Sequence, residues 1–303
     1  MVKRINWPIV ALIIANIIWG ATSPIFKYAL ENIPPFSLAF IRFLGASLLL
    51  YPLVHKKIDY PDLKNKLLWG FGLTGVTLNI FFYFLALPRI ISINAPIIGS
   101  TGPIMVLIGG ALFLKEKVKK FELIGILISV IGVAIIILQP IFQTGIKMEF
   151  LGSFFIILAT TSAVISTIIG RKFLTPENAL GSTFWVFLLG ALTFAPLMLW
   201  EFVQNPFWLA QLDSRGILGI VYGIFFASTI AYAFYDHALA QMPAYKTSIF
   251  AYIDPVAAIL VAIPLLGERI TPPFVIGSAL VFLGILTAEK RLHWHPLHKV
   301  LKK

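Results

Sequence analysis

The chain has 303 residues, of which 59% are hydrophobic and only 12% are charged, and its mean hydropathy is +0.92. Soluble domains average roughly 25% charged residues, so this composition excludes an ordinary soluble enzyme and a disordered chain. The sequence has no cysteine, which also excludes a disulfide-bonded scaffold. The remaining class is an integral membrane protein. In that class the excess of 24 Lys and Arg over 13 Asp and Glu reports on the loops between spans.

Ten apolar stretches are long enough to cross the hydrocarbon core as helices, which takes about 20 residues. They cover residues 7–30, 34–54, 66–87, 92–114, 121–139, 150–170, 180–202, 215–240, 246–266 and 272–289. The stretches are apolar on all sides and lack the alternation of β-barrel strands. The predicted fold class is therefore an all-α integral membrane protein with ten transmembrane helices. Pro and Gly within the stretches predict that some of these helices are kinked or broken.

The charges between the stretches predict an orientation. With a cytoplasmic N-terminus, 18 of the 24 Lys and Arg lie on the cytoplasmic side and four on the other side. By the positive-inside rule, we expect a multi-pass protein of the cytoplasmic membrane with both termini inside. Basic loops beside anionic lipid account for the charge without a nucleic-acid partner. The sequence has no GxxxxGK[ST] motif, so a transport function would be that of a channel or a secondary carrier.

The two halves of the chain share an internal repeat. The pattern YxxAL occurs at residues 83–87 and again 152 residues later, at residues 235–239. Four further residues recur at the same offset: Pro103, Glu116, Gly125 and Gly132 correspond to Pro255, Glu268, Gly277 and Gly284. Because each half holds five predicted spans, the second half would enter the membrane in inverted orientation. The expected division is a first repeat over 1–145, a second over 146–291 and a basic cytoplasmic tail over 292–303.

These features together resemble a known family. Trp19-Gly20 in the first span, Ile41-Arg42-Phe43 in the second, and the repeated YxxAL…P…E[KR]…G pattern are similar to the drug/metabolite transporter superfamily, in its EamA-type branch. The resemblance implies a ten-helix secondary transporter, usually an exporter of amino acids or other small metabolites. It also implies a central cavity lined by helices 1, 3, 4, 6, 8 and 9, and alternating access to that cavity. We expect no cofactor, and no metal, because His237 is the one histidine that lies within a predicted span.

Two acidic residues are the strongest candidates for a substrate site. Asp236 and Asp254 lie within predicted spans, where an ionised carboxyl costs at least about 2.5–3.5 kcal/mol on insertion scales. We expect them to bind a substrate ammonium or a coupling proton. The alternative is a fixed ion pair or a capping contact with His237, Lys246 or Arg42. For Arg42 we favour a structural role, by pairing with Glu31 or by extending to the interface, over the alternative of direct contact with the substrate.

Further candidates could line the cavity or bend its helices. The aromatic and polar candidates for substrate binding are Trp19, Asn79, Tyr83, Thr101, Ser162, Trp185, Tyr232 and Tyr252. Plain packing, or hydrogen bonding of Ser and Thr to their own helix, is the alternative for each. Gly102, Pro103 and Pro255 are candidates for gating, with a static kink as the alternative.

Other classes of protein remain as alternatives. A passive channel or a lipid scramblase would share the composition. An intramembrane aspartyl-type enzyme is less favoured, because residues 251–254 read AYID where such enzymes have GxGD. The paired glycines Gly125, Gly132, Gly277 and Gly284 predict close helix packing, either within a monomer or in a homodimer.

Overall fold

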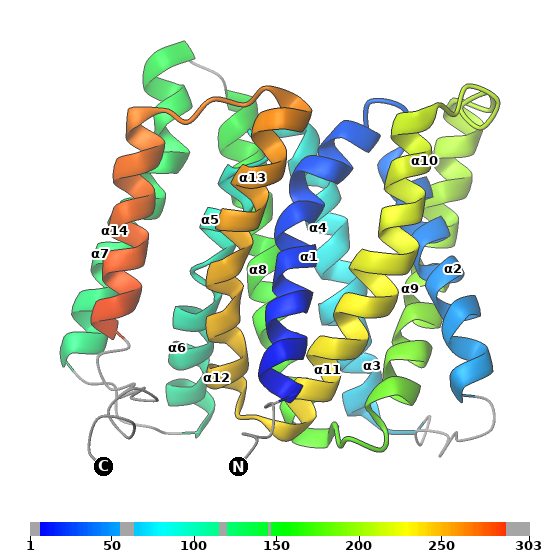
Figure 1. Cartoon of the computed structure of the whole chain (residues 1–303), viewed down its shortest axis with the longest axis horizontal. Coiled ribbons are helices and arrows are strands. Elements are labelled where there is room, and N and C mark those ends of the chain that lie inside the picture. The colour runs from blue at the N-terminus through cyan, green and yellow to red at the C-terminus, as the bar shows by residue number, and fades with distance from the viewer. Residues whose placement is uncertain (1–6, 55–63, 115–119, 145–146, 289–303) are drawn as a thin grey trace, which may run out of the picture.

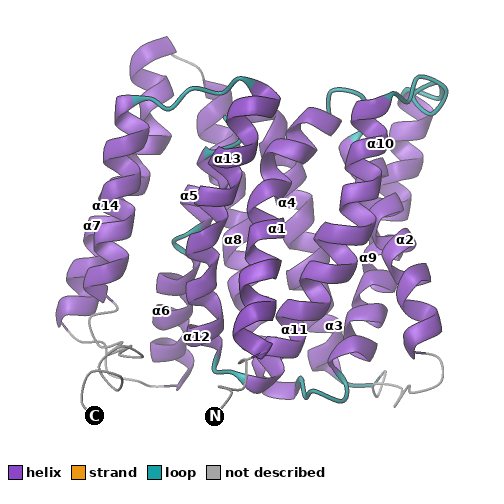
Figure 2. Cartoon of the chain, in the orientation of Figure 1, coloured by secondary structure: helices purple, strands orange, loops and turns teal. Residues whose placement is uncertain are grey.

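The computed structural model describes residues 7–54, 64–114, 120–144 and 147–288. Within these ranges all regular structure is helical and no strand occurs (Figure 2). Long helices lie side by side, and most of the described loops join them at the two ends of the bundle, whereas the loop after α5 lies at mid-height (Figures 1 and 2). The prediction of an all-helical fold is confirmed.

Six of the predicted stretches form single α-helices. These are α1 (Trp7–Ala29), α2 (Pro35–Val54), α7 (Lys120–Thr144), α8 (Lys147–Phe173), α9 (Ala179–Gln204) and α14 (Pro272–Ala288). The other four stretches are divided into shorter helices that follow one another along the bundle (Figure 1).

Two of the divided stretches contain a π-helical segment. The first comprises α3 (Lys66–Gly72), the π-helix η1 (Leu73–Leu78), α4 (Asn79–Ala86) and the 3-10 turn η2 (Leu87–Arg89). The second comprises α10 (Ser214–Val221), the π-helix η3 (Tyr222–Ile230) and α11 (Ala231–Gln241). A π-helix leaves backbone carbonyls available to outside donors and is common at functional sites.

The other two divided stretches are broken near their middle. One comprises α5 (Asn94–Gly99) and α6 (Gly102–Leu114). The other comprises α12 (Ala244–Ser248), the 3-10 segment η4 (Ile249–Ile253) and α13 (Asp254–Leu266). Pro103 and Pro255 are therefore not kinks inside continuous helices, as the sequence suggested. Each lies in the first turn of a new helix, where its missing N–H has no intrahelical partner to lose.

Six helical stretches among the described residues are long and apolar enough to cross a bilayer. They are Trp7–Ala29, Pro35–Val54, Lys66–Arg89, Glu149–Phe173, Ala179–Gln204 and Ser214–Gln241. Three shorter apolar helices accompany them: Leu127–Ile136, Phe250–Leu266 and Pro272–Gly284. Many large apolar side chains on the bundle are exposed, such as Val203 at 75% and Leu260 at 71%. Such exposure suits a surface that faces lipid.

Glycines allow two pairs of helices to pack closely. A Cβ at Gly20 of α1 would clash with the backbone carbonyl of Asp254 and lie 2.7 Å from the Ala257 Cβ, so α1 and α13 touch almost backbone to backbone. Between α7 and α14, a Cβ at Gly132 would lie 2.5 Å from the Gly277 carbonyl oxygen. The paired glycines thus serve packing within the chain.

Candidate functional site

A cavity of about 270 Å³ lies inside the bundle. Its wall is formed mainly by α1, η1, α4, α5, α6, α8 and α11, with single residues from α2, α3, α9, α12, η4 and α13. The wall is largely apolar and carries a small number of polar side chains. This combination, at a volume near the lower end for small-molecule sites, suits a small solute.

Eight of the predicted site and gating residues lie in the cavity wall. They are Trp19, Asn79, Tyr83, Gly102, Pro103, Tyr232, Asp236 and Asp254. Five do not contribute to it: Thr101, Ser162, Trp185, Tyr252 and Pro255.

The residues outside the wall have other contacts. The Thr101 hydroxyl donates to the Ile98 carbonyl at 2.7 Å, so it bonds its own backbone. The Tyr252 ring packs against Phe282, with ring centroids 6.3 Å apart. The Trp185 ring packs edge-on against its neighbour Phe184.

The two acidic residues lie in the same cavity but in different surroundings. The Asp236 carboxylate is 2% exposed and accepts a hydrogen bond of 2.7 Å from the Thr183 hydroxyl of α9. Asp254 is the first residue of α13, and its Oδ1 is buried with no hydrogen-bond partner among the described residues. A buried carboxylate oxygen without a donor is costly, so Asp254 is the group with the greater need of a ligand.

The predicted ionic partners of these acids are not found. Within the described part of the chain, neither Asp236 nor Asp254 forms an ion pair, so pairing with His237 or Arg42 is wrong. The side chain of Lys246 lies outside the described residues.

Trp19 forms the centre of an aromatic wall. Its indole Nε1 donates to the Ala227 carbonyl of η3 at 3.0 Å. Its ring lies 5.1 Å from that of Tyr232 and 5.0 Å from that of Tyr235, centroid to centroid. The Asn79 amide donates to the Ala159 carbonyl at 2.8 Å, which ties α4 to α8. These hydrogen bonds hold the side chains rigidly against the cavity.

Arg42 is buried rather than extended to the interface. Its side chain is 1% exposed, and it contributes to the cavity wall from α2. Its Nε donates to the Ser228 hydroxyl at 2.6 Å, and its Nη2 to the Ala227 carbonyl at 3.3 Å. The expected pairing with Glu31 is wrong, because Glu31 accepts from Arg215 at 2.9 Å on the surface.

Several other polar residues also line the wall. They include Asn16, Thr22, Ser23, Thr160, Ser166 and Thr167. The signal in the sequence is their spacing, since Asn16, Trp19, Ser23 and Lys27 recur at three or four residues and therefore share one face of α1.

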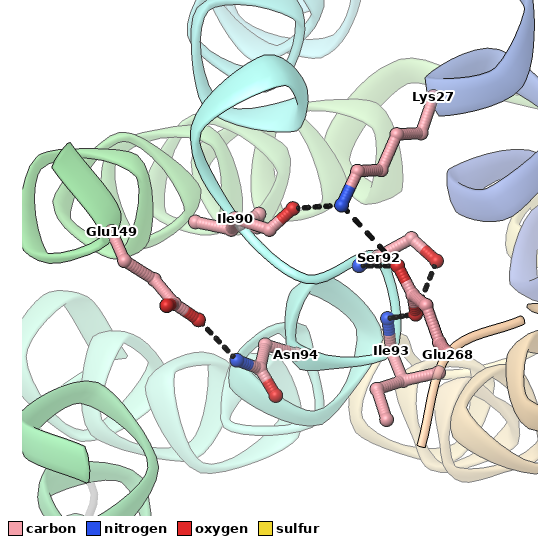
Figure 3. Close-up of polar contacts among 7 residues, drawn as sticks. All are labelled: Lys27, Ile90, Ser92, Ile93, Asn94, Glu149 and Glu268. Atoms are coloured by element: carbon pink, nitrogen blue, oxygen red, sulfur yellow. Dashed lines mark hydrogen bonds and ion pairs between the residues drawn. The ribbon is translucent and has the colours of Figure 1, made fainter. Parts of the chain in front are cut away.

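Lys27 and Glu268 form the core of a polar cluster at the end of the bundle where α1 and α13 end (Figure 3). The Lys27 ammonium lies 3.3 Å from Glu268 Oε1 and donates to the Ile90 carbonyl at 2.5 Å. Glu268 Oε1 also accepts from the Ser92 backbone N–H at 2.7 Å. Its Oε2 accepts from the Ser92 hydroxyl at 2.9 Å and from the Ile93 N–H at 3.2 Å. We call Lys27, Ile90, Ser92, Ile93 and Glu268 the rim cluster.

The rim cluster joins distant parts of the chain. Gly267, with φ +62°, ends α13 in the left-handed conformation that favours glycine, and so directs Glu268 back toward the segment before α5. Beside it, the Asn94 amide donates to Glu149 of α8 at 3.0 Å (Figure 3). Lys27 lies one helical turn beyond Ser23 of the cavity wall, so the cluster lies one turn beyond the cavity along α1.

The chain is similar to several known proteins along most of its length. The EamA-like transporter family model matches residues 6–138 and again residues 150–288. An uncharacterized transporter of Archaeoglobus fulgidus is 28% identical over 94% of this chain and 99% of its own length. The uncharacterized transporter YetK of Bacillus subtilis is 30% identical over 94% of this chain and 87% of its own length.

A relative from Escherichia coli bears a functional name. This probable amino-acid metabolite efflux pump is 24% identical over 96% of this chain and 97% of its own length. One solved crystal structure superposes with a TM-score of 0.64 at 16% identity, covering 95% of this chain and 99% of that one, and therefore supports the fold alone. The relatives are transporters rather than enzymes. The chain is thus a multi-pass membrane transporter of small molecules, and it belongs to the EamA-like transporter family.

Proposed function

We propose that the chain is a secondary carrier that exports a small metabolite, such as an amino acid, by alternating access to the cavity. The observation that carries this proposal is a mostly apolar cavity inside the bundle whose wall holds Asp254, with a carboxyl Oδ1 that lacks a hydrogen-bond partner among the described residues. A name given to a relative, amino-acid metabolite efflux pump, supports the class of solute.

The proposal includes ten spans arranged as two inverted halves, over residues 1–145 and 146–291. The helix irregularities support it, because they recur at the repeat offset. The π-helix η1, shifted by 152 residues, falls within η3. At the same shift, the 13 residues of α6 coincide with the 13 residues of α13. Broken helices in corresponding positions are typical of inverted-repeat carriers, whose solute sites lie at the breaks.

Helix pairing supports the same division. α2 packs extensively on α9, and α7 on α14, each the counterpart of the other in the repeat. α1 contacts α11 and α13, whereas its counterpart α8 contacts α4 and α6. A pseudo-two-fold axis would produce this exchange of partners.

In this proposal the rim cluster is the closed outer gate. α1 begins and α14 ends at the opposite end of the bundle, which the positive-inside rule assigns to the cytoplasm (Figure 1). Since Lys27 belongs to the first half and Glu268 to the second, opening the outer side would require their contact to break. The proposed cycle alternates between closure at this cluster and closure at the cytoplasmic end.

Solute counterflow in proteoliposomes tests this function. Vesicles preloaded with a candidate solute should accumulate its labelled form transiently, with saturable kinetics, because a carrier exchanges solute across its cycle. A thermal-shift screen of amino acids, amines, nucleosides and sugars selects the candidates, since a ligand that binds the folded state raises its apparent stability. Flux that rises linearly with concentration and shows no counterflow would refute the carrier and favour a passive channel.

A further inference from the structure

We propose that Arg42 binds the anionic group of the transported solute and that Asp254 binds its cationic group, so that the carrier selects small zwitterions. This inference rests on the proposed function and adds a residue that sets specificity. It starts from a feature of the wall that packing leaves unexplained: the Arg42 guanidinium and the Asp254 carboxyl group share one cavity without pairing, and each keeps a buried polar atom with no hydrogen-bond partner among the described residues.

The Arg42 guanidinium is held firmly but is not neutralised. It lies over the Phe26 ring at 5.2 Å and the Phe43 ring at 4.8 Å, measured from Cζ to the ring centroids. Ser228 and the Ala227 carbonyl take Nε and Nη2. No carboxylate of the described residues forms an ion pair with it, and its Nη1 is buried without a hydrogen-bond partner.

A charge in this position has a large energetic cost. Moving an ion from water into a protein interior costs several kcal/mol even after the protein relaxes. The two phenylalanine rings and the two neutral hydrogen-bond acceptors around Arg42 do not replace a counter-ion. A guanidinium presents a planar fork of donors whose geometry matches a carboxylate. Because Arg42 contributes to the cavity wall, a solute carboxylate in the cavity could supply the missing charge.

Asp254 is the complementary group. Its unpartnered Oδ1 could accept from a solute ammonium, with the same energetic logic. Asp254 lies in the same cavity wall as Arg42 and comes from the other half of the chain. A solute with both charges would satisfy both buried groups at once. A purely cationic or purely anionic solute would leave one of them unpaired.

Three matched sets of probes test this selection on the unmodified protein. Each set contains a zwitterion, its amide, which lacks the negative charge, and its deamino acid, which lacks the positive charge. The zwitterions are alanine, leucine and phenylalanine. The measurement is how strongly each probe inhibits counterflow of the labelled solute found in the assay above, in proteoliposomes. We expect at least one zwitterion to have a half-inhibitory concentration at least tenfold below those of both its partners.

Variants then assign the charges to residues. Arg42→Gln should raise the half-inhibitory concentration of the preferred zwitterion at least tenfold and leave that of its amide within twofold. Asp254→Asn should weaken the zwitterion similarly and leave the deamino acid within twofold. Arg42→Lys, which keeps the charge but loses the planar fork, should restore part of the zwitterion's affinity.

Other outcomes overturn the proposal. If the amide or the deamino acid equals the zwitterion in every set, the cavity does not select two charges. If Arg42→Gln fails to fold, the probe sets on the unmodified protein decide alone. If amines, nucleosides or sugars show counterflow and no amino acid does, this inference fails and the carrier function stands. If no solute shows counterflow, the proposed function fails with it.

Discussion

Burial and the absence of partners distinguish the residues of the cavity. Asp236 accepts a hydrogen bond from Thr183 and so has a partner within the cavity wall. Asp254 and Arg42, in contrast, each retain a buried polar atom without a hydrogen-bond partner among the described residues. Trp19 and Asn79 are fixed by hydrogen bonds to backbone carbonyls. The rigid groups shape the cavity, and the groups without partners are those with which a bound solute can form hydrogen bonds.

Removing the charge of Asp254 should impair transport. An amide in its place cannot form a charge-assisted hydrogen bond, which contributes about 1.5–3 kcal/mol, so Asp254→Asn should raise the half-saturation concentration tenfold or more. Kinetics of solute uptake into proteoliposomes measure this. Asp213→Asn is the matched control: Asp213 caps α10 outside the cavity, and Asn caps equally well. Equal kinetics for both variants would remove Asp254 from the site.

The sequence predicted some of these residues because a charge inside an apolar span is costly wherever it points. This cost distinguished Asp236 and Asp254 in the sequence. Burial of Arg42 was not predicted, because a long side chain near a span end can reach water. The sequence also does not show that a hydroxyl and a carbonyl of η3 accept hydrogen bonds from it. Thr101 was predicted as a polar residue of the cavity, but its hydroxyl bonds the nearby backbone carbonyl of Ile98.

Breaks within the helices, and close contacts between them, determine the shape of the bundle around the cavity. Hydrophobic length predicted where the helices lie. It could not predict η1 or η3, because a run that is apolar on every side has no face whose period separates an α-helix from a π-helix. Prolines marked the breaks at α6 and α13, but the tight contact of α1 with α13 depends on Gly20, which the sequence offered only as part of a motif.

A methyl group at Gly20 should separate α1 from α13. Its Cβ would overlap the Asp254 carbonyl, and such overpacking costs about 1–3 kcal/mol, so Gly20→Ala should lower the melting temperature of the purified protein by several degrees. Gly181→Ala in α9 is the control, because a Cβ there meets nothing within 4 Å. If both variants melt at the same temperature, the contact between α1 and α13 is not tight.

At the scale of the whole molecule, the rim cluster and the repeat give the carrier its proposed sidedness. The rim cluster holds together a helix end from one half and a helix end from the other (Figure 3). Charge bias in the sequence predicted the orientation, and the repeat predicted the pairing of halves. The ion pair of Lys27 with Glu268 could not be predicted, because the two residues lie 241 positions apart.

Single cysteines test the orientation directly, because the chain has none of its own. Gln211 and Glu177 are both exposed, in loops at opposite ends of the bundle. A membrane-impermeant maleimide should label Gln211→Cys in intact cells and Glu177→Cys only after the membrane is permeabilised. The reverse pattern would invert the proposed topology.

Opening of the cavity to each side in turn is tested most directly by the reactivity of Ser23→Cys with an impermeant thiol reagent applied from each side of the membrane. Breaking the rim cluster with Glu268→Gln should raise the rate from the outside and lower the rate from the cytoplasmic side, because one population of carriers moves from one state to the other. The reactivity of Gln211→Cys should stay unchanged. If Glu268→Gln raises both rates together, or changes neither, the cavity does not alternate between an inward-open and an outward-open state.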